Sequence, residues 1–91
     1  MAVLVLPREL TQAQAGACLS MLVQGMRSES GSSVEVDASA LDRFDSSAIA
    51  VLLEFRRNCL AQGKTMLIRA LPARLADLAG LYGLNELLAS A

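Results

Sequence analysis

The fold is decided by residues 34–53, which read VEVDASALDRFDSSAIAVLL. The first four of these residues predict a short buried strand, and a polar turn follows them. The apolar run from Ala48 onward then predicts a helix that opens on Asp45-Ser46-Ser47. Two hydroxyls and a carboxylate therefore gather where the first backbone N–H groups of a helix lack partners. Such a spot is either an ordinary cap or a site for an anion or phosphate, because the helix dipole favours negative charge there.

The segment that precedes this stretch predicts a strand and a helix. Residues 2–6 form a continuous Val- and Leu-rich run, which indicates a strand that is buried on both faces. A helix is expected to follow, from a cap at Thr11 to about Gly25. Residues 28–33 read SESGSS and are short enough to be a connection within one domain.

The segment that follows predicts the same alternation again. The central helix is expected to end at Gln62, because Gly63 is a natural stop, and residues 65–69 predict a third strand. Pro72 suits the first turn of another helix, which Gly83 would end before a last short turn. Strands that alternate with helices favour right-handed crossovers. We therefore expect an α/β fold with a small, mixed but mostly parallel sheet and about three helices.

The central helix carries more apolar surface than one buried face requires. At about 100° per residue, its main core stripe is formed by Ala48, Val51, Leu52, Phe55 and Cys59. Ile49, Leu53 and Leu60 extend this stripe past Arg56 toward the solvent side. The wide stripe indicates either deep burial or a docking surface for another protein that is bordered by Ile49 and Leu53.

Composition limits the class of function. The chain has 91 residues and is expected to form one domain over residues 1–91. It is 54% hydrophobic but only 3% aromatic, so the core must be built from aliphatic side chains and methionine. The net charge is -1 and the basic residues are scattered, which argues against a nucleic-acid-binding surface.

Cysteine and histidine usage argues against metal and hydrolytic chemistry. Cys18 and Cys59 each lie in an apolar helical pattern, so we expect two buried thiols in a reducing compartment. The chain has no histidine and no paired cysteine motif, so we expect no zinc site, no cofactor and no catalytic residue. The N-terminal apolar run is too short for a signal peptide, and no stretch has the length of a membrane span. A cytoplasmic location is the resulting expectation.

The ordered set of motifs resembles the STAS domain family over nearly the whole chain. PRELT at residues 7–11 resembles the Gly-Glu-Leu-Asp segment of that family, and FDSSA at residues 44–48 resembles its Asp-Ser-Ser-Gly signature. Residues 65–72 resemble the strand that leads into a Pro-initiated helix, and residues 81–84 resemble the closing Gly-Leu-Phe element. The chain departs from the pattern where Arg8 and Ala48 replace glycines, and it lacks the usual extra first strand and last strand.

The resemblance implies an interaction module rather than an enzyme. A minimal domain of this kind is most similar to the STAS subunits of Mla-type phospholipid transporters, which bind the ATPase subunit of an ABC system that maintains outer-membrane lipid asymmetry. Contact with the membrane would then be indirect, through the complex. The residues that match the implied contact are Asp45, Ser46, Ser47, Ile49, Leu53 and Arg56.

Two alternatives stay open. The first is an anti-sigma-factor antagonist that a partner kinase regulates at Ser46, the position that is phosphorylated in that branch of the family. The second is a small phosphate-handling enzyme, which the lack of a Gly-rich phosphate loop, histidine and metal cluster disfavours. Asp45 and Ser46 are also candidate helix caps. Asp37 and Ser39 are expected to order their turn through bonds from side chain to backbone.

Overall fold

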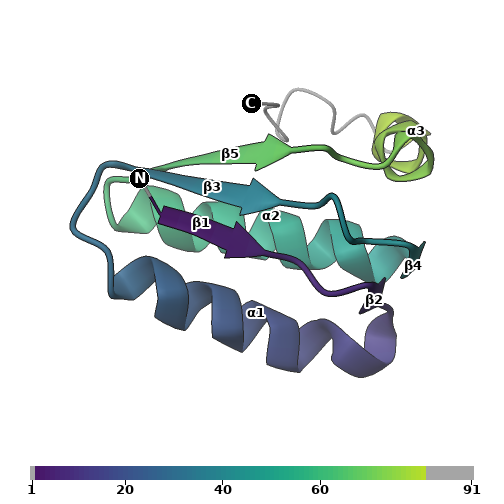
Figure 1. Cartoon of the computed structure of the whole chain (residues 1–91), viewed down its shortest axis with the longest axis horizontal. Helices are drawn as coiled ribbons and strands as arrows, with labels where there is room; N and C mark the ends of the chain where they lie inside the picture. The colour runs from purple at the N-terminus through teal and green to yellow at the C-terminus, as the bar shows by residue number, and fades with distance from the viewer. Residues whose placement is uncertain (1, 82–91) are drawn as a thin grey trace.

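Three parallel strands carry the fold (Figure 1). The computed structural model describes residues 2–81. Its main sheet has the order β1-β3-β5, and the strands are β1 (Ala2–Val5), β3 (Ser33–Asp37) and β5 (Thr65–Arg69). Val34 of the central strand is in register with Ala2 on one side and Met66 on the other. The predicted α/β class is confirmed, and within residues 2–81 every strand pair is parallel rather than mixed.

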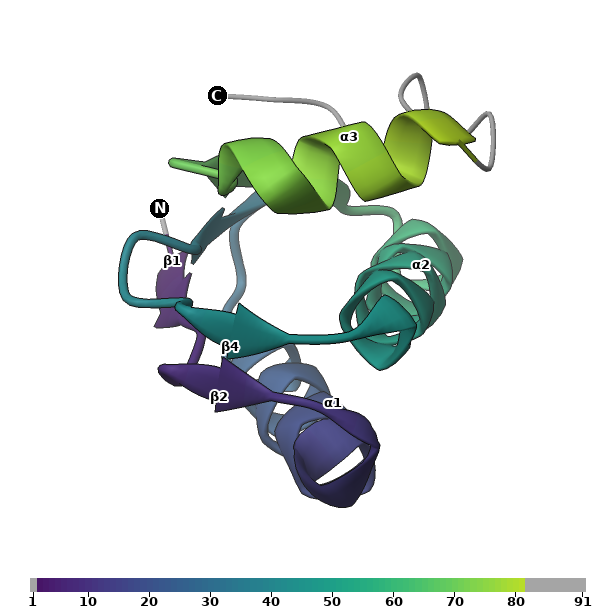
Figure 2. The ribbon, with the colours of Figure 1, turned by 90° about the vertical axis from the view of Figure 1, so that its right-hand side faces the viewer.

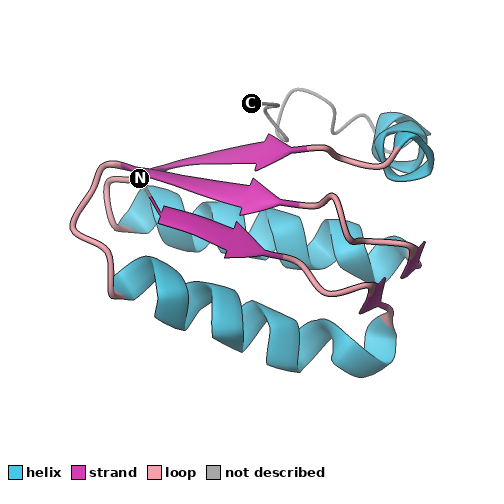
Figure 3. Ribbon diagram, in the orientation of Figure 1, coloured by secondary structure: helices cyan, strands magenta, loops and turns pink. Residues whose placement is uncertain are grey.

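Two long helices connect these strands and lie on the same face of the sheet (Figure 3). They are α1 (Gln12–Arg27) and α2 (Ser46–Ala61). This placement is expected when both crossovers have the same hand. A third helix, α3 (Ala73–Leu81), lies across the end of the sheet where the strands finish (Figure 2). The predicted helix end at Gly83 and the turn after it lie outside the described residues.

A second, two-stranded parallel sheet joins the starts of the two long helices. Its strands are β2 (Glu9–Leu10) and β4 (Arg43–Phe44), and each directly precedes the cap of a helix (Figure 2). The backbone N–H groups of Asp42 and Arg43 both donate to the carbonyl oxygen of Arg8, at 2.8 and 2.9 Å. This small sheet was absent from our sequence-based expectation, and it holds the N-terminal ends of α1 and α2 at the same end of the molecule.

The prediction that the first strand is buried on both faces is wrong. Val3 and Val5 are 49% and 54% exposed. The reason is that β1 is an edge strand, and the described helices cover only one face of the sheet. Leu4 points to that covered face and packs closely on α1. A Cβ atom added to Gly25 would lie 2.6 Å from Leu4 Cδ2, so glycine permits this approach.

The core lies between the sheet and the helices. Its largest fully buried side chains include Leu22, Val36, Leu52, Phe55 and Ile68. The five residues predicted for the main stripe of α2 are all buried. Both cysteines are buried free thiols, as predicted, and burial raises the pKa of each thiol. No helix within residues 2–81 combines the length and the apolar character needed to cross a membrane.

Lys64 fastens the loop after α1 to the start of β5. The residue is only 8% exposed, and its Nζ atom donates to the carbonyl oxygens of Glu29 and Gly31 at 2.7 and 2.5 Å. Gly63, directly before it, has φ +70° and ends α2 as predicted, since glycine adopts this left-handed conformation without a steric penalty.

Candidate functional site

The N-terminus of α2 is capped by Asp45. Its Oδ1 atom accepts a hydrogen bond from the backbone N–H of Ser47 at 2.8 Å, and its Oδ2 atom accepts one from the N–H of Gln12 at 3.3 Å. These donors, that of Ser47 above all, lower the pKa of the Asp45 carboxyl group. One carboxylate therefore serves the first turns of both α1 and α2. Of the two predicted cap candidates, the structure selects Asp45.

Ser46 is the first residue of α2 and does not cap it. Its side chain is exposed, whereas Ser47 is half-buried. Because an α-helix turns by about 100° per residue, the two serines face different flanks of α2. Ser47 lines a shallow groove of about 390 Å³ between α1 and α2, together with Ala15, Gly16, Leu19, Ala50, Val51 and Glu54. The predicted cluster is thus divided between two flanks.

The flank of α2 that bears Ser46 combines a hydroxyl, apolar side chains and an arginine. Residues 53, 56 and 60 follow Ser46 at helical spacing and lie on the same flank. Leu53 and Arg56 are half-buried, while Leu60 is 51% exposed. We call Ser46, Leu53, Arg56 and Leu60 the Ser46 flank. It runs the length of α2 on the side away from α1, and the structure brings three of the predicted docking residues together on it.

The assignment of Ile49 to an exposed docking surface is wrong. Ile49 shares the Ser46 flank by spacing, but its side chain is only 4% exposed. It belongs to the buried core cluster, which also contains Leu75 and Ala79 of α3. Deep burial, the first of the two predicted explanations, therefore accounts for Ile49 in the wide apolar stripe of α2, while Leu60 remains on the surface. The docking surface stays a prediction.

The turn after β3 is ordered by Asp37, as predicted. Its Oδ1 atom accepts a hydrogen bond from the N–H of Ser39 at 2.9 Å, and its Oδ2 atom accepts one from the Arg69 guanidinium at 2.8 Å. The hydrogen bonds from Ser39, followed by that from Arg69, lower the pKa of Asp37 to about 2. The same contact raises the pKa of Arg69. Asp37 therefore has a structural role on the helix-free face of the sheet.

A polar hollow at the small sheet was missed by sequence reasoning. It is lined by Arg8, Glu9, Asp42 and Arg43. Arg43 pairs with Glu9 at 3.3 Å, and both side chains are solvent-exposed, so this ion pair contributes little stability. Nearby, the guanidinium of Arg74 lies 5.0 Å from the centre of the Phe44 ring and donates to the Asp42 carbonyl at 2.9 Å. These contacts depend on the pairing of β2 with β4, which no local pattern signals.

Comparison with protein-family models gives a match over almost the entire chain. The family is described as "Mlab, STAS domain", and its model matches residues 2–89. The match includes the end of β3, the Asp45 cap and the whole of α2. A search of curated proteins finds no match.

Proposed function

Since the chain belongs to the Mlab-type STAS domain family, we propose that it is a cytoplasmic accessory subunit of an Mla-type phospholipid transporter. In this proposal it binds the ATPase subunit of that ABC system, supports its activity and is not itself an enzyme. It meets the inner membrane only through the complex, and the system maintains the lipid asymmetry of the outer membrane.

The Ser46 flank is the observation that carries the proposal. It places the exposed hydroxyl of Ser46 at one end of α2 and the exposed apolar side chain of Leu60 at the other, with Leu53 and Arg56 between them. Apolar and arginine side chains in one continuous strip suit a protein interface, where such groups lose water together. Asp45 caps the first turn, so the exposed hydroxyl of Ser46 is not needed as a cap and, within residues 2–81, is available to a partner.

The test is co-purification of substituted chains with the ATPase encoded beside the gene. Ser46→Glu and Leu60→Glu should abolish or strongly reduce binding, because each places a carboxylate where the interface would desolvate it. Both side chains are exposed, so the isolated domain should keep its melting temperature to within a few degrees. Leu53→Glu probes the middle of the strip, but Leu53 also packs against the core, so its effect counts only if the variant remains folded.

Ser20→Glu is the matched control. Ser20 is exposed on α1, so the same change from serine to glutamate is made at an exposed helix position on a different helix. The proposal expects Ser20→Glu to bind the ATPase like the parent chain. Undiminished binding by both Ser46→Glu and Leu60→Glu would place the contact elsewhere.

The exposed hydroxyl of Ser46 also suits the second candidate function, an anti-sigma-factor antagonist. A phosphate on Ser46 would face the positive end of the α2 dipole and the carboxylate of Asp45 at once, which would change the charge of the flank. Binding to a kinase-like anti-sigma factor, with phosphate transfer that Ser46→Ala abolishes, would favour this function over transport.

A further inference from the structure

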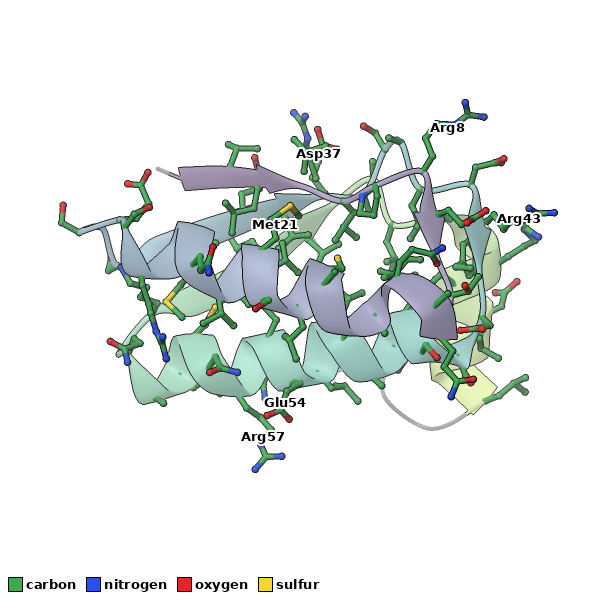
Figure 4. All side chains as sticks on the ribbon, turned by 90° about the horizontal axis from the view of Figure 1, so that it is seen from below. Arg8, Met21, Asp37, Arg43, Glu54 and Arg57 are labelled. Atoms are coloured by element: carbon green, nitrogen blue, oxygen red, sulfur yellow. The ribbon has the colours of Figure 1, made fainter. Side chains whose placement is uncertain are left out.

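An apolar patch lies along the edge of β1 with which no other strand within residues 2–81 pairs. Val3 and Val5 alternate with Leu4, so they point to the helix-free face, and both are about half exposed. Met21, on the adjoining side of α1 (Figure 4), is 49% exposed. A shallow hollow beside the strand is lined by Val5, Leu6, Pro7, Gln14, Ala17, Cys18 and Met21. These residues carry no charge, and they lie on the opposite side of α1 from the groove with α2.

The backbone of β1 offers hydrogen-bonding groups on the same edge. In a parallel pair, alternate residues direct both backbone groups to the neighbouring strand. The N–H of Leu6 donates to the Asp37 carbonyl at 2.9 Å, so Leu4 and Leu6 face β3. The N–H and C=O groups of Val3 and Val5 therefore point away from the sheet. Within residues 2–81 no strand pairs with this edge of β1. An edge with apolar side chains and outward-pointing backbone groups is a template for another strand.

We propose that β1 pairs in antiparallel orientation with β1 of a second copy of this chain. With Leu4 on the two-fold axis, Val3 of one copy lies opposite Val5 of the other. Each such pair exchanges two hydrogen bonds, because both residues have their backbone groups directed outward. The two sheets then join into one, and the valine side chains of the two copies become cross-strand neighbours.

The charge of the residues at this edge and the area that they can bury indicate a second copy of the chain as the partner and limit the affinity of the dimer. A two-fold contact brings the same surface of both copies together, so a charged contact surface would repel itself, and the hollow on the α1 side of this edge has no charged lining. A stable interface takes roughly 800 Å² from each partner. That is a large share of the 5099 Å² exposed by this chain. One short strand and one helix side cover less than that, so we expect a weak, reversible dimer. The Ser46 flank stays free in this dimer.

The test is sedimentation of the full chain over a concentration series up to about 1 mM. The parent chain should rise from monomer toward twice the monomer mass. Val5→Pro removes an outward N–H that β3 does not use, and Val5→Lys puts a charge opposite Val3 of the other copy, so both variants should remain monomeric throughout. Leu60→Lys is the control, because it replaces a side chain of similar exposure away from this edge.

Amide hydrogen exchange tests whether the edge of β1 is the interface of the dimer. At the dimeric concentration, the exchange of the Val3 and Val5 amides should slow at least about tenfold relative to the monomer, provided that the dimer is the dominant species. A parent chain that stays monomeric to 1 mM would overturn the proposal. A dimer in which the Val3 and Val5 amides still exchange fast would also overturn it. So would a folded Val5→Lys variant that still dimerises.

Discussion

At the scale of single residues, Asp37 joins the end of β3 to the end of β5. Its carboxylate accepts hydrogen bonds from Ser39 and Arg69, and the side chain is 13% exposed beside a more exposed arginine. The pKa of Asp37 in the folded chain, about 2, lies below its ordinary value of 3.8. These contacts therefore stabilise the fold in full above about pH 4, and that contribution is lost as the pH falls through about 2.

Asp37→Asn should accordingly make stability less dependent on pH. The variant should unfold at lower urea concentration than the parent at pH 7, and the difference should shrink steadily between pH 4 and pH 2. Urea melts at several pH values measure this. Asp42→Asn is the control, because the carboxylate of Asp42 accepts none of the hydrogen bonds found within residues 2–81. A difference in the urea concentration of unfolding between Asp37→Asn and the parent that is as large at pH 2 as at pH 7 would contradict this account.

Lys64 is the second residue with a role of its own. Replacing it with methionine keeps most of the buried stem but removes both hydrogen bonds to the carbonyl groups of the loop at residues 29–31. We expect Lys64→Met to lower the free energy of unfolding by about 1–3 kcal/mol, as for hydrogen bonds that involve a charged group. Arg57→Ala, which breaks only an exposed pair with Glu54 (Figure 4), should cost less than about 0.5 kcal/mol. Equal effects from the two variants in denaturant melts would count against a structural role for Lys64.

At the scale of elements, α2 contributes the most continuous part of the core. Leu52 is fully buried between the sheet and its neighbouring helices. Leu52→Ala should cost about 2–5 kcal/mol, since the cavity it leaves has little room to close. Leu60→Ala on the exposed side of the same helix should change stability by no more than about 0.5 kcal/mol. A thermal melt of each variant distinguishes the two positions, and an unchanged melt for Leu52→Ala would remove that residue from the core.

The elements also show where sequence reasoning succeeds. The apolar spacing of α2 predicted its bounds to within one residue, because one face of that helix meets the sheet along its whole length. Asp45 and Ser46 were harder to separate, since both residue types cap helices and only backbone geometry decides between them. The pairing of β2 with β4 joins two-residue strands that are distant in the chain, so no periodicity could reveal it.

At the scale of the whole molecule, the sequence predicted the order of the three main strands and the helices between them, but not how each face of the sheet is covered. An apolar run such as residues 2–6 is typical of a strand with a layer on both sides. The same run occurs here at an edge where only one side is covered, so Val3 and Val5 remain exposed. The division of the predicted docking residues has a similar origin. Spacing placed Ile49 with Leu53, but Ile49 belongs to the same buried cluster as residues of α3, and only the tertiary structure reveals that burial.

The parallel pairing also sets how the chain must fold. Val34 is in register with Ala2 and with Met66, each of which is 32 residues away in sequence. Neither pair can begin as a local hairpin, so each requires closure of a long loop before any strand contact forms. We therefore expect α1 and α2 to form before the strands pair, because their hydrogen bonds are local and form within microseconds. High sequence separation slows folding, and folding times in the millisecond range are the expected consequence for a domain of this topology.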